Sequence, residues 1–468
     1  MYSPRPPAMP LDTPMKIAIS IALLLLIAFF LPLSEGSPAL EGLDPGTIRL
    51  GLAFFACIAC LWMTEALPLA ITALLVPVLG AAMGLSDVKT SLASFAAPPI
   101  FLFFGGFAIA SALSAQGIDR WLAEKLAKLG KGKFVPVALL LFLGTAVLSM
   151  WMSNTATTAM MIPLALGILN QFGEGKKKLN NRWFLLLGLA YSASIGGLGT
   201  IVGSPPNGIA AKQLDVTFSE WMAFGIPAVI LLLPIMVIAL YLMLRPSNPD
   251  EKKLMIEGET EDFQFTMQRK VTLGIFALTA VSWIFSSKIG AWFSISSMDT
   301  WIALTAVVAL AVAKVVTWKQ IEHGTEWGVL LLFGGGLALS GILGSSGTSL
   351  FLARLLGGAM DAWPLWAIVG AVVCFVIFLT ELSSNTASAA LLVPIFFTMA
   401  TEFDLAPAKL ILPLALAASC AFMLPVGTPP NAIVFGTGLV PQREMIRVGV
   451  VLNMLFVLLI TGLSMVFF

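Results

Sequence analysis

Charged residues are scarce in this sequence of 468 residues. Asp, Glu, Lys and Arg make up 11% of it and hydrophobic residues 58%, whereas about 25% of the residues in a soluble domain are charged. This composition excludes a water-soluble fold and predicts an all-α polytopic membrane protein. The formal net charge of +1 also excludes nucleic-acid binding as the main function.

Histidine and cysteine are also rare, with one His and four Cys. Cys57 and Cys60 form a Cys-x-x-Cys pair inside an apolar run, where the thiolate that redox chemistry needs is disfavoured. His323 lies in a polar stretch between apolar segments. We expect neither the cysteine pair nor the histidine to carry the function.

Apolar runs long enough to cross a membrane, about 20 residues each, recur along the whole chain. We predict about eleven crossings, and the apolar run 17–33 is the retained first helix rather than a signal peptide. The predicted crossings are 15–33, 46–62, 67–85, 99–127, 183–211, 218–244, 269–287, 296–316, 326–355, 408–438 and 445–468.

Two further apolar blocks, 135–171 and 365–401, are too long for one straight crossing. A continuous helix of that length would rise on the order of 54 Å, whereas the hydrocarbon core is about 30 Å thick. Each block contains a Ser-Asn-Thr sequence near its middle, at 153–155 and 384–386. We therefore predict that each block is a re-entrant hairpin with Ser-Asn-Thr at its tip.

The charges beside these blocks predict their orientation. Lysines and arginines flank the first block on both sides, whereas acidic residues flank the second. Because basic residues stay on the cytoplasmic side, the first hairpin enters from the cytoplasm and the second from outside. This topology places the N-terminus in the cytoplasm and the C-terminus outside, in a multi-pass protein of the plasma membrane (the inner membrane of a bacterial cell).

The sequence also repeats itself beyond the hairpins. A Gly-Ser-Pro-Pro-Asn run at 203–207 matches Gly-Thr-Pro-Pro-Asn at 427–431, and a Phe-Gly-Gly run precedes each hairpin. Since the two hairpins open to opposite sides, we predict inverted-topology repeats, which many secondary transporters share. The predicted units are N-terminal scaffold helices (1–98), a first repeat (99–244) with hairpin 135–171 and broken helix 183–211, a cytoplasmic connector (245–268), a second repeat (269–444) with hairpin 365–401 and broken helix 408–438, and a C-terminal helix (445–468).

The four polar clusters have a defined chemistry. Ser, Asn and Thr cap helix N-termini, and a half-helix N-terminus inside a membrane attracts anions. Paired prolines break a helix and free carbonyl groups, which must line a polar cavity or bind an ion. Because no Lys, Arg or His lies in the clusters, a bound anion would need a co-bound cation, which favours symport. Glu381, beside the second tip, either holds a backbone amide or takes part in coupling.

In these residues the chain resembles the divalent anion/sodium symporter family, the INDY-type dicarboxylate transporters. The resemblance covers nearly the whole chain. It implies a homodimer in which each protomer has a scaffold domain and a transport domain that moves like an elevator. It also implies import of C4 dicarboxylates such as succinate, malate and fumarate, driven by co-transported sodium ions.

Carried over position by position, the resemblance implies two sodium sites and one substrate site. The first sodium site would use Ser149, Ser153, Asn154 and Gly203, and the second Thr380, Ser383, Asn385 and Gly427. The substrate would contact Ser153, Asn154, Thr155, Ser384, Asn385, Thr386, Thr428 and Pro429.

Other functions remain open at this point. Some members of the family exchange dicarboxylates without sodium, and others carry citrate or sulfate. A channel could also use opposed re-entrant loops. We do not expect an enzyme, because the clusters contain no His, no paired Asp and no Ser/Lys arrangement.

Overall fold

The computed structural model describes residues 13–33, 37–171, 176–247, 263–360 and 362–467. Every regular element in these ranges is a helix, which confirms the predicted all-α membrane fold. Six helices are long and apolar enough to cross a membrane, or seven when the bent pair α12 (Met267–Ile284) and α13 (Ser286–Phe293) counts as one crossing. The count of eleven crossings stays a prediction. Most of the predicted connector, 245–268, lies outside the described residues.

The same order of elements occurs twice along the chain. A long apolar helix is followed by a short helix, two apolar helices joined by a tight turn, a helix with an irregular interruption, and a final long helix. The first series is α5 (Pro98–Ala115), α6 (Ile118–Leu129), α7 (Phe134–Ser149), α8 (Asn154–Leu169), α9 (Lys176–Gly196), α10 (Pro205–Leu214) and α11 (Phe218–Leu244). The second is α16 (Trp327–Ser345), α17 (Thr348–Met360), α18 (Leu365–Thr380), α19 (Asn385–Glu402), α20 (Ala408–Ala418), α21 (Pro429–Gly436) and α22 (Gln442–Phe467).

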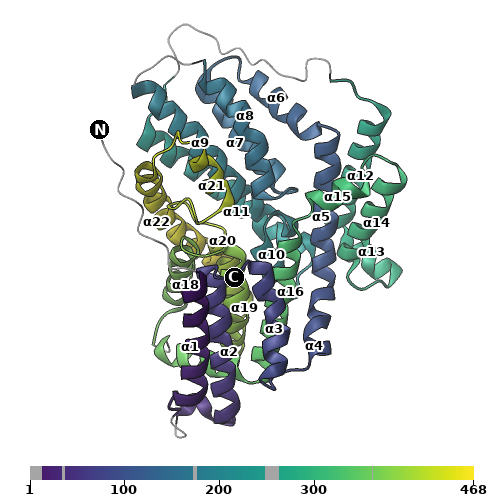
Figure 1. Ribbon diagram of the computed structural model, residues 1–468. Helices are drawn as coiled ribbons and strands as arrows, with labels where there is room; N and C mark the ends of the chain where they lie inside the picture. Colours follow the sequence, from purple (N-terminus) through teal and green to yellow (C-terminus); the bar gives the residue numbers. More distant parts are fainter. Residues whose placement is uncertain (1–12, 34–36, 172–175, 248–262, 361, 468) are drawn as a thin grey trace.

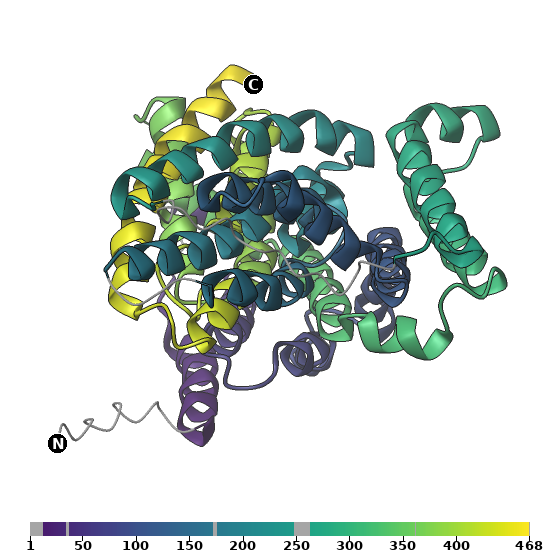
Figure 2. The same ribbon diagram turned by 90° about the horizontal axis from the view of Figure 1, so that it is seen from above.

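The remaining helices precede or separate the two series. They are α1 (Thr13–Phe30), α2 (Pro45–Thr64), α3 (Leu69–Ala82), α4 (Val88–Ala93), α14 (Met298–Val312) and α15 (Trp318–Gly324), together with α12 and α13. α3 packs along α16, and α14 packs along α5. Seen from above, α12 to α14 form a group at one edge of the molecule, beside α5 (Figure 2).

Two predicted crossings, 99–127 and 326–355, are each divided into two helices. α5 ends at Ala115 and α16 at Ser345. Gly117 and Gly347 follow with φ angles of +65° and +76°, a backbone region that glycine enters at little cost. The apolar residues that resume after both turns, from Ile118 and from Leu350, led us to count each pair of helices as one crossing.

Both long blocks fold back on themselves at the Ser-Asn-Thr sequence. α6 contacts α7 and also α8, so the chain returns toward its starting point after the turn, and α7 and α8 lie side by side in Figure 1. The first part of each broken helix packs against both helices of its own hairpin, α9 on α7 and α8, and α20 on α18 and α19. The second part packs against the other hairpin, α10 on α19 and α21 on α8. This exchange brings both tips and both helix breaks together.

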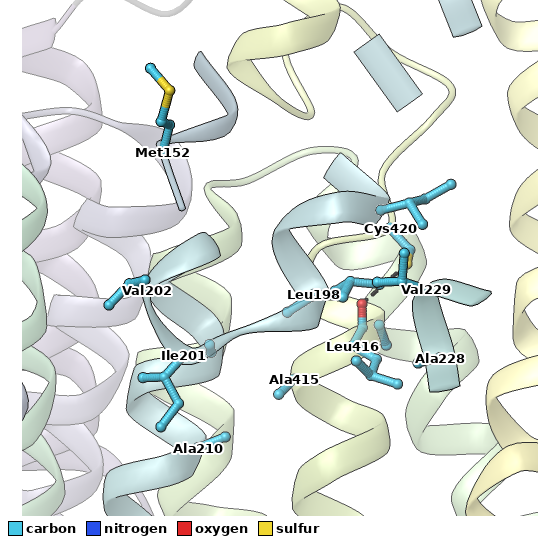
Figure 3. Close-up of a cluster of buried hydrophobic side chains, with 14 of the residues drawn as sticks. Met152, Leu198, Ile201, Val202, Ala210, Ala228, Val229, Ala415, Leu416 and Cys420 are labelled. Atoms are coloured by element: carbon cyan, nitrogen blue, oxygen red, sulfur yellow. Dashed lines mark hydrogen bonds between the residues drawn. The ribbon is translucent and has the colours of Figure 1, made fainter. Parts of the chain in front are cut away.

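Apolar side chains fill the space around the breaks. Leu198, Ile201 and Val202 come from the first break, Leu416 comes from α20, and Cys420 comes from the segment just after α20 (Figure 3). All five are buried. The polar backbone of the breaks is therefore enclosed by apolar side chains and must find its hydrogen-bond partners within the protein.

Glu381 supplies those partners in the second break. Its side chain is 2% exposed. Its carboxylate accepts hydrogen bonds from the backbone N–H groups of Phe422 (2.6 Å), Met423 (2.8 Å) and Leu424 (2.9 Å), and from the Asn453 side chain (2.7 Å). Of the two roles open at the sequence level, the contacts give Glu381 the structural one, that of holding the irregular segment after α20.

We expect replacement of Glu381 by leucine to destabilise the protein strongly. The change leaves three N–H groups without an acceptor, one buried and two partly buried, and an unpaired buried group costs about 1–3 kcal/mol. Thermal unfolding of the purified protein in detergent measures the effect. Glu402→Leu is the matched control, because Glu402 forms an ion pair with Arg354 (2.8 Å) and is partly exposed; such pairs contribute about 0–1 kcal/mol. Equal losses in the two variants would contradict the structural role of Glu381.

Candidate functional site

Each hairpin tip is a serine that caps the returning helix. Ser153 precedes α8 and its Oγ accepts a hydrogen bond from the Ala156 N–H (3.2 Å). Ser384 precedes α19 and accepts from the Ala387 N–H (3.5 Å). The helices thus begin at Asn154 and Asn385. Their first turns present backbone N–H groups and the positive end of the helix dipole.

The two tip asparagines are held in the same way in both repeats. Ser149 ends α7, and its hydroxyl lies 2.6 Å from Asn154 Oδ1. Thr380 ends α18, and its hydroxyl lies 2.5 Å from Asn385 Oδ1 and 3.1 Å from the Ala418 carbonyl. Each hairpin therefore joins the last residue of its first helix to the first residue of its second through a hydroxyl–amide contact.

The Asn154 amide also touches the first helix break. It lies 3.0 Å from the Ala193 carbonyl and 3.3 Å from the Gly203 carbonyl, and its nitrogen donates to both when it is turned toward them. With the oxygen turned inward, Asn154 Oδ1, Ser149 Oγ and these two carbonyls make a cluster of oxygen atoms. A Cβ on Gly197 would lie 2.5 Å from Asn154 Oδ1, so only glycine fits there.

The asparagines of the two Pro-Pro-Asn sequences donate hydrogen bonds to the backbone carbonyl groups that the helix breaks leave unpaired. Asn207 donates to the carbonyls of Gly197 and Thr200, both at 2.8 Å. Asn431 donates to the carbonyls of Ala421 and Leu424, both at 3.0 Å. The sequence predicted that these carbonyls need partners, and the partners lie within the same motifs.

An aromatic cluster fixes the first tip against neighbouring helices. Trp151 stacks on Trp283 of α12 with 6.3 Å between ring centroids, and on Phe218 of α11 at 6.2 Å. It also meets Phe276 of α12 edge-on at 5.3 Å. In this conformation of the protein, these contacts hold the turn that presents Ser153 and Asn154.

A cavity of about 730 Å³ lies where the tips and breaks meet. All eight residues predicted to contact the substrate line it, as do Gly203 and Gly427. Four helices, α8, α10, α19 and α21, begin at its wall. Glu65 and Glu326 line it too, whereas no Lys, Arg or His is among the described residues of its wall.

Three residues of the predicted sodium sites lie behind the cavity wall. Ser149 and Thr380 reach the site through Asn154 and Asn385, as described above. The Ser383 hydroxyl instead contacts the Leu379 carbonyl (3.0 Å) and the Ser388 hydroxyl (2.8 Å). Its side chain is thus occupied away from Asn385.

The apolar part of the cavity wall was not predicted. It includes Phe103 and Phe107 of α5 and Leu332 of α16. These residues flank the repeated Phe-Gly-Gly runs, which the sequence showed only as evidence of duplication. The pairing of those runs in matched positions was the signal that could have located this wall.

Comparison with known proteins places the chain among transporters. Residues 59–408 match the citrate transporter family (CitMHS). The chain is 49% identical to an uncharacterized transporter of Haemophilus influenzae, an alignment that covers 89% of this chain and 91% of that protein. It is 34% identical to the sodium-dependent dicarboxylate transporter SdcS of Staphylococcus saprophyticus, over 89% of this chain and 85% of SdcS.

A solved structure supports the fold. The YdaH transporter of Alcanivorax borkumensis superposes with a TM-score of 0.55 at 13% identity, covering 80% of this chain and 86% of that one. At this identity the likeness concerns the fold alone. The sequence matches and the fold together show that the chain belongs to the citrate transporter family, among the divalent anion/sodium symporters that its motifs resemble, and is a membrane transporter rather than an enzyme.

Proposed function

We propose that this protein imports C4 dicarboxylates, such as succinate, malate and fumarate, together with sodium ions. The observation that carries the proposal is the cavity in which both Ser-Asn-Thr tips and both helix breaks meet without a cationic side chain among its described residues. The relative named SdcS, a sodium-dependent dicarboxylate transporter, supports both the substrate class and the cation.

The charges at the cavity favour cation coupling. The N-termini of the hairpin helices α8 and α19 supply roughly half a positive charge each, whereas a dicarboxylate carries two negative charges. α10 and α21 begin with two prolines each and so lack the first amide donors. Glu65 and Glu326 add negative charge to the same cavity. Cations bound with the substrate would balance the remaining charge.

The oxygen cluster at Asn154 fits the needs of sodium. Ser149 Oγ, Asn154 Oδ1 and the carbonyls of Ala193 and Gly203 are hard oxygen ligands held close together. When the amide oxygen of Asn154 binds sodium, its nitrogen faces away from the carbonyls and can donate to a substrate carboxylate at the tip. Thr380, Asn385 and the Ala418 carbonyl repeat the arrangement in the second half. Sodium binding would thus prepare the substrate site.

The elevator movement and the homodimer belong to the same proposal. The hairpins, broken helices, α11 and α22 pack on one another and would form the moving transport domain, while α1 to α5, α12 to α14 and α16 would form the scaffold. In the predicted topology Glu65 and Glu326 lie at cytoplasmic helix ends, so the cavity described above would face the cytoplasm.

The decisive experiment is uptake of labelled succinate into proteoliposomes with and without an inward sodium gradient. We expect uptake to require the gradient and to be inhibited by malate and fumarate but not by sulfate or citrate. Uptake that does not depend on sodium but requires dicarboxylate inside the vesicles would show that the protein is an exchanger rather than a symporter. Inhibition by citrate as strong as that by succinate would move the substrate class to tricarboxylates.

We expect Asn154→Ala and Asn385→Ala each to reduce sodium-dependent uptake at least a hundredfold, because each removes one amide shared by a sodium site and the substrate site. Asn170→Ala is the matched control, since Asn170 caps the other end of α8 and is exposed. Near-normal uptake by either tip variant, reconstituted at equal density, would refute the assignment of the site.

Asn154→Asp separates the two roles of this side chain. A carboxylate still offers an oxygen to sodium, but it repels a substrate carboxylate and cannot donate to it. We expect sodium to raise the melting temperature of this variant, as in the parent protein, while succinate no longer does. If succinate stabilises Asn154→Asp as well as it does the parent, Asn154 does not contact the substrate.

The predicted topology is tested with single cysteines introduced at exposed positions in a background without the four native ones. Asn170→Cys, after the first hairpin, should react with a membrane-impermeant maleimide only from the cytoplasmic side. Ala362→Cys, before the second hairpin, should react only from outside. Labelling of both from the same side would contradict the inverted repeats.

A further inference from the structure

α6 and the turn that leads from it to α7 separate their charges by face. Lys125, Lys128, Lys131 and Lys133 are all exposed. The acidic residues of α6 point the other way, with Asp119 3% exposed and Glu124 8% exposed. The outer surface of this segment therefore carries these four lysines, together with the exposed Arg120, and no acidic side chain of α6.

The four lysine side chains have no acidic partner within the described part of the chain. None of them forms an ion pair with a described residue, whereas Arg354 and Arg447 do. Four ammonium groups kept close together repel one another unless an external anion balances them. The segment is thus complementary to a surface of negative charge.

The matching helix of the second repeat has a different surface. α17 occupies the same place in the element order as α6. It contains no lysine, and its only arginine, Arg354, bonds to Glu402 (2.8 Å) and to the Glu41 carbonyl (2.7 Å). The architecture of the repeat therefore does not require a basic face, so the face on α6 needs another explanation.

The position of α6 supplies one. It follows directly on α5, which is part of a predicted crossing, and it runs obliquely at one end of the molecule (Figure 1). Ile118, Ala123 and Ala127 are buried against the protein, while Leu129, 66% exposed, lies among the lysines. An amphipathic helix with lysines and an exposed leucine at the end of a crossing suits the headgroup region of a membrane.

We propose that α6 and the turn after it bind the headgroups of anionic phospholipids in the cytoplasmic leaflet. A cluster of four or more basic residues on an amphipathic helix at the cytoplasmic surface recognises such lipids through the summed attraction of the charges. Because α6 leads into α7, a lipid bound there would hold the arm that carries the first hairpin. The lipid contact itself depends only on the charges of this segment and not on the transported substrate.

The test is native mass spectrometry of the purified full chain, titrated with phosphatidylglycerol or with phosphatidylcholine of the same acyl chains. The variant Lys125→Gln, Lys128→Gln, Lys131→Gln and Lys133→Gln should bind phosphatidylglycerol at least tenfold more weakly than the parent and phosphatidylcholine equally well. The matched control removes four other basic residues with exposed side chains, through Lys314→Gln, Lys319→Gln, Arg443→Gln and Arg447→Gln, and should keep the parent affinity.

Two further arms make the result decisive. The fourfold Lys→Arg variant of the same segment should retain binding, which shows that charge rather than altered folding is measured. Millimolar inorganic phosphate should not displace the lipid; displacement would assign the segment to a soluble anion instead. Equal losses in the glutamine variant and its control would overturn the proposal. Because succinate uptake is not the readout, failure of the transport proposal leaves this test intact.

Discussion

Every backbone polar group enclosed in this apolar protein must find a partner, and the helix breaks are where that requirement is hardest to meet. A straight helix satisfies its own N–H and C=O groups, whereas an interrupted helix exposes them. In this chain the side chains of Asn207, Asn431 and Glu381 meet the need. Because they hold the irregular segments in place, both breaks and both tips can face one cavity.

The two halves reach the same geometry with different chemistry. In the second half a buried carboxylate, Glu381, accepts three backbone N–H groups after α20. The matching position in the first half is Met150, whose carbonyl accepts a hydrogen bond from the Thr200 hydroxyl (2.5 Å). Hydrogen bonds to an ionisable side chain thus stabilise the second break, whereas hydrogen bonds between neutral groups stabilise the first. The repeats are therefore alike in shape but not in electrostatics.

The sequence predicted the features that contrast with their surroundings. Ser-Asn-Thr and Pro-Pro-Asn stand out because polar, helix-breaking residues are costly in apolar segments, and the cavity gathers the eight substrate-contact residues predicted from the clusters. The basic flank of the first hairpin was equally visible. Each of these signals depends on residues that a membrane helix would otherwise avoid.

Other features have no such contrast. The repeated Phe-Gly-Gly runs mark the neighbourhood of Phe103, Phe107 and Leu332, which line the cavity. They do not mark the side chains themselves, because an apolar residue that faces a cavity and one that faces lipid look the same in a sequence. The separation of α5 from α6 depends on the positive φ of Gly117, and a glycine in a sequence does not by itself show which backbone conformation it adopts. The role of Glu381 could be assigned only from its contacts. An acidic residue in an apolar segment can have a structural role or a role in ion coupling, and the surrounding sequence looks the same in both cases.

Close packing of glycines unites the first tip and the first break into one body. A Cβ on Gly203 would lie 2.5 Å from the Gly197 carbonyl, and a Cβ on Gly197 would lie 2.8 Å from the Gly203 carbonyl. The Asn154 amide packs directly on this pair. Close-packed protein interiors transmit small displacements. A change in the orientation of the Asn154 amide therefore shifts the carbonyl groups that it contacts and alters the cavity that it lines. One side chain thereby connects the two groups of oxygen and nitrogen atoms that a coupled transporter has to coordinate.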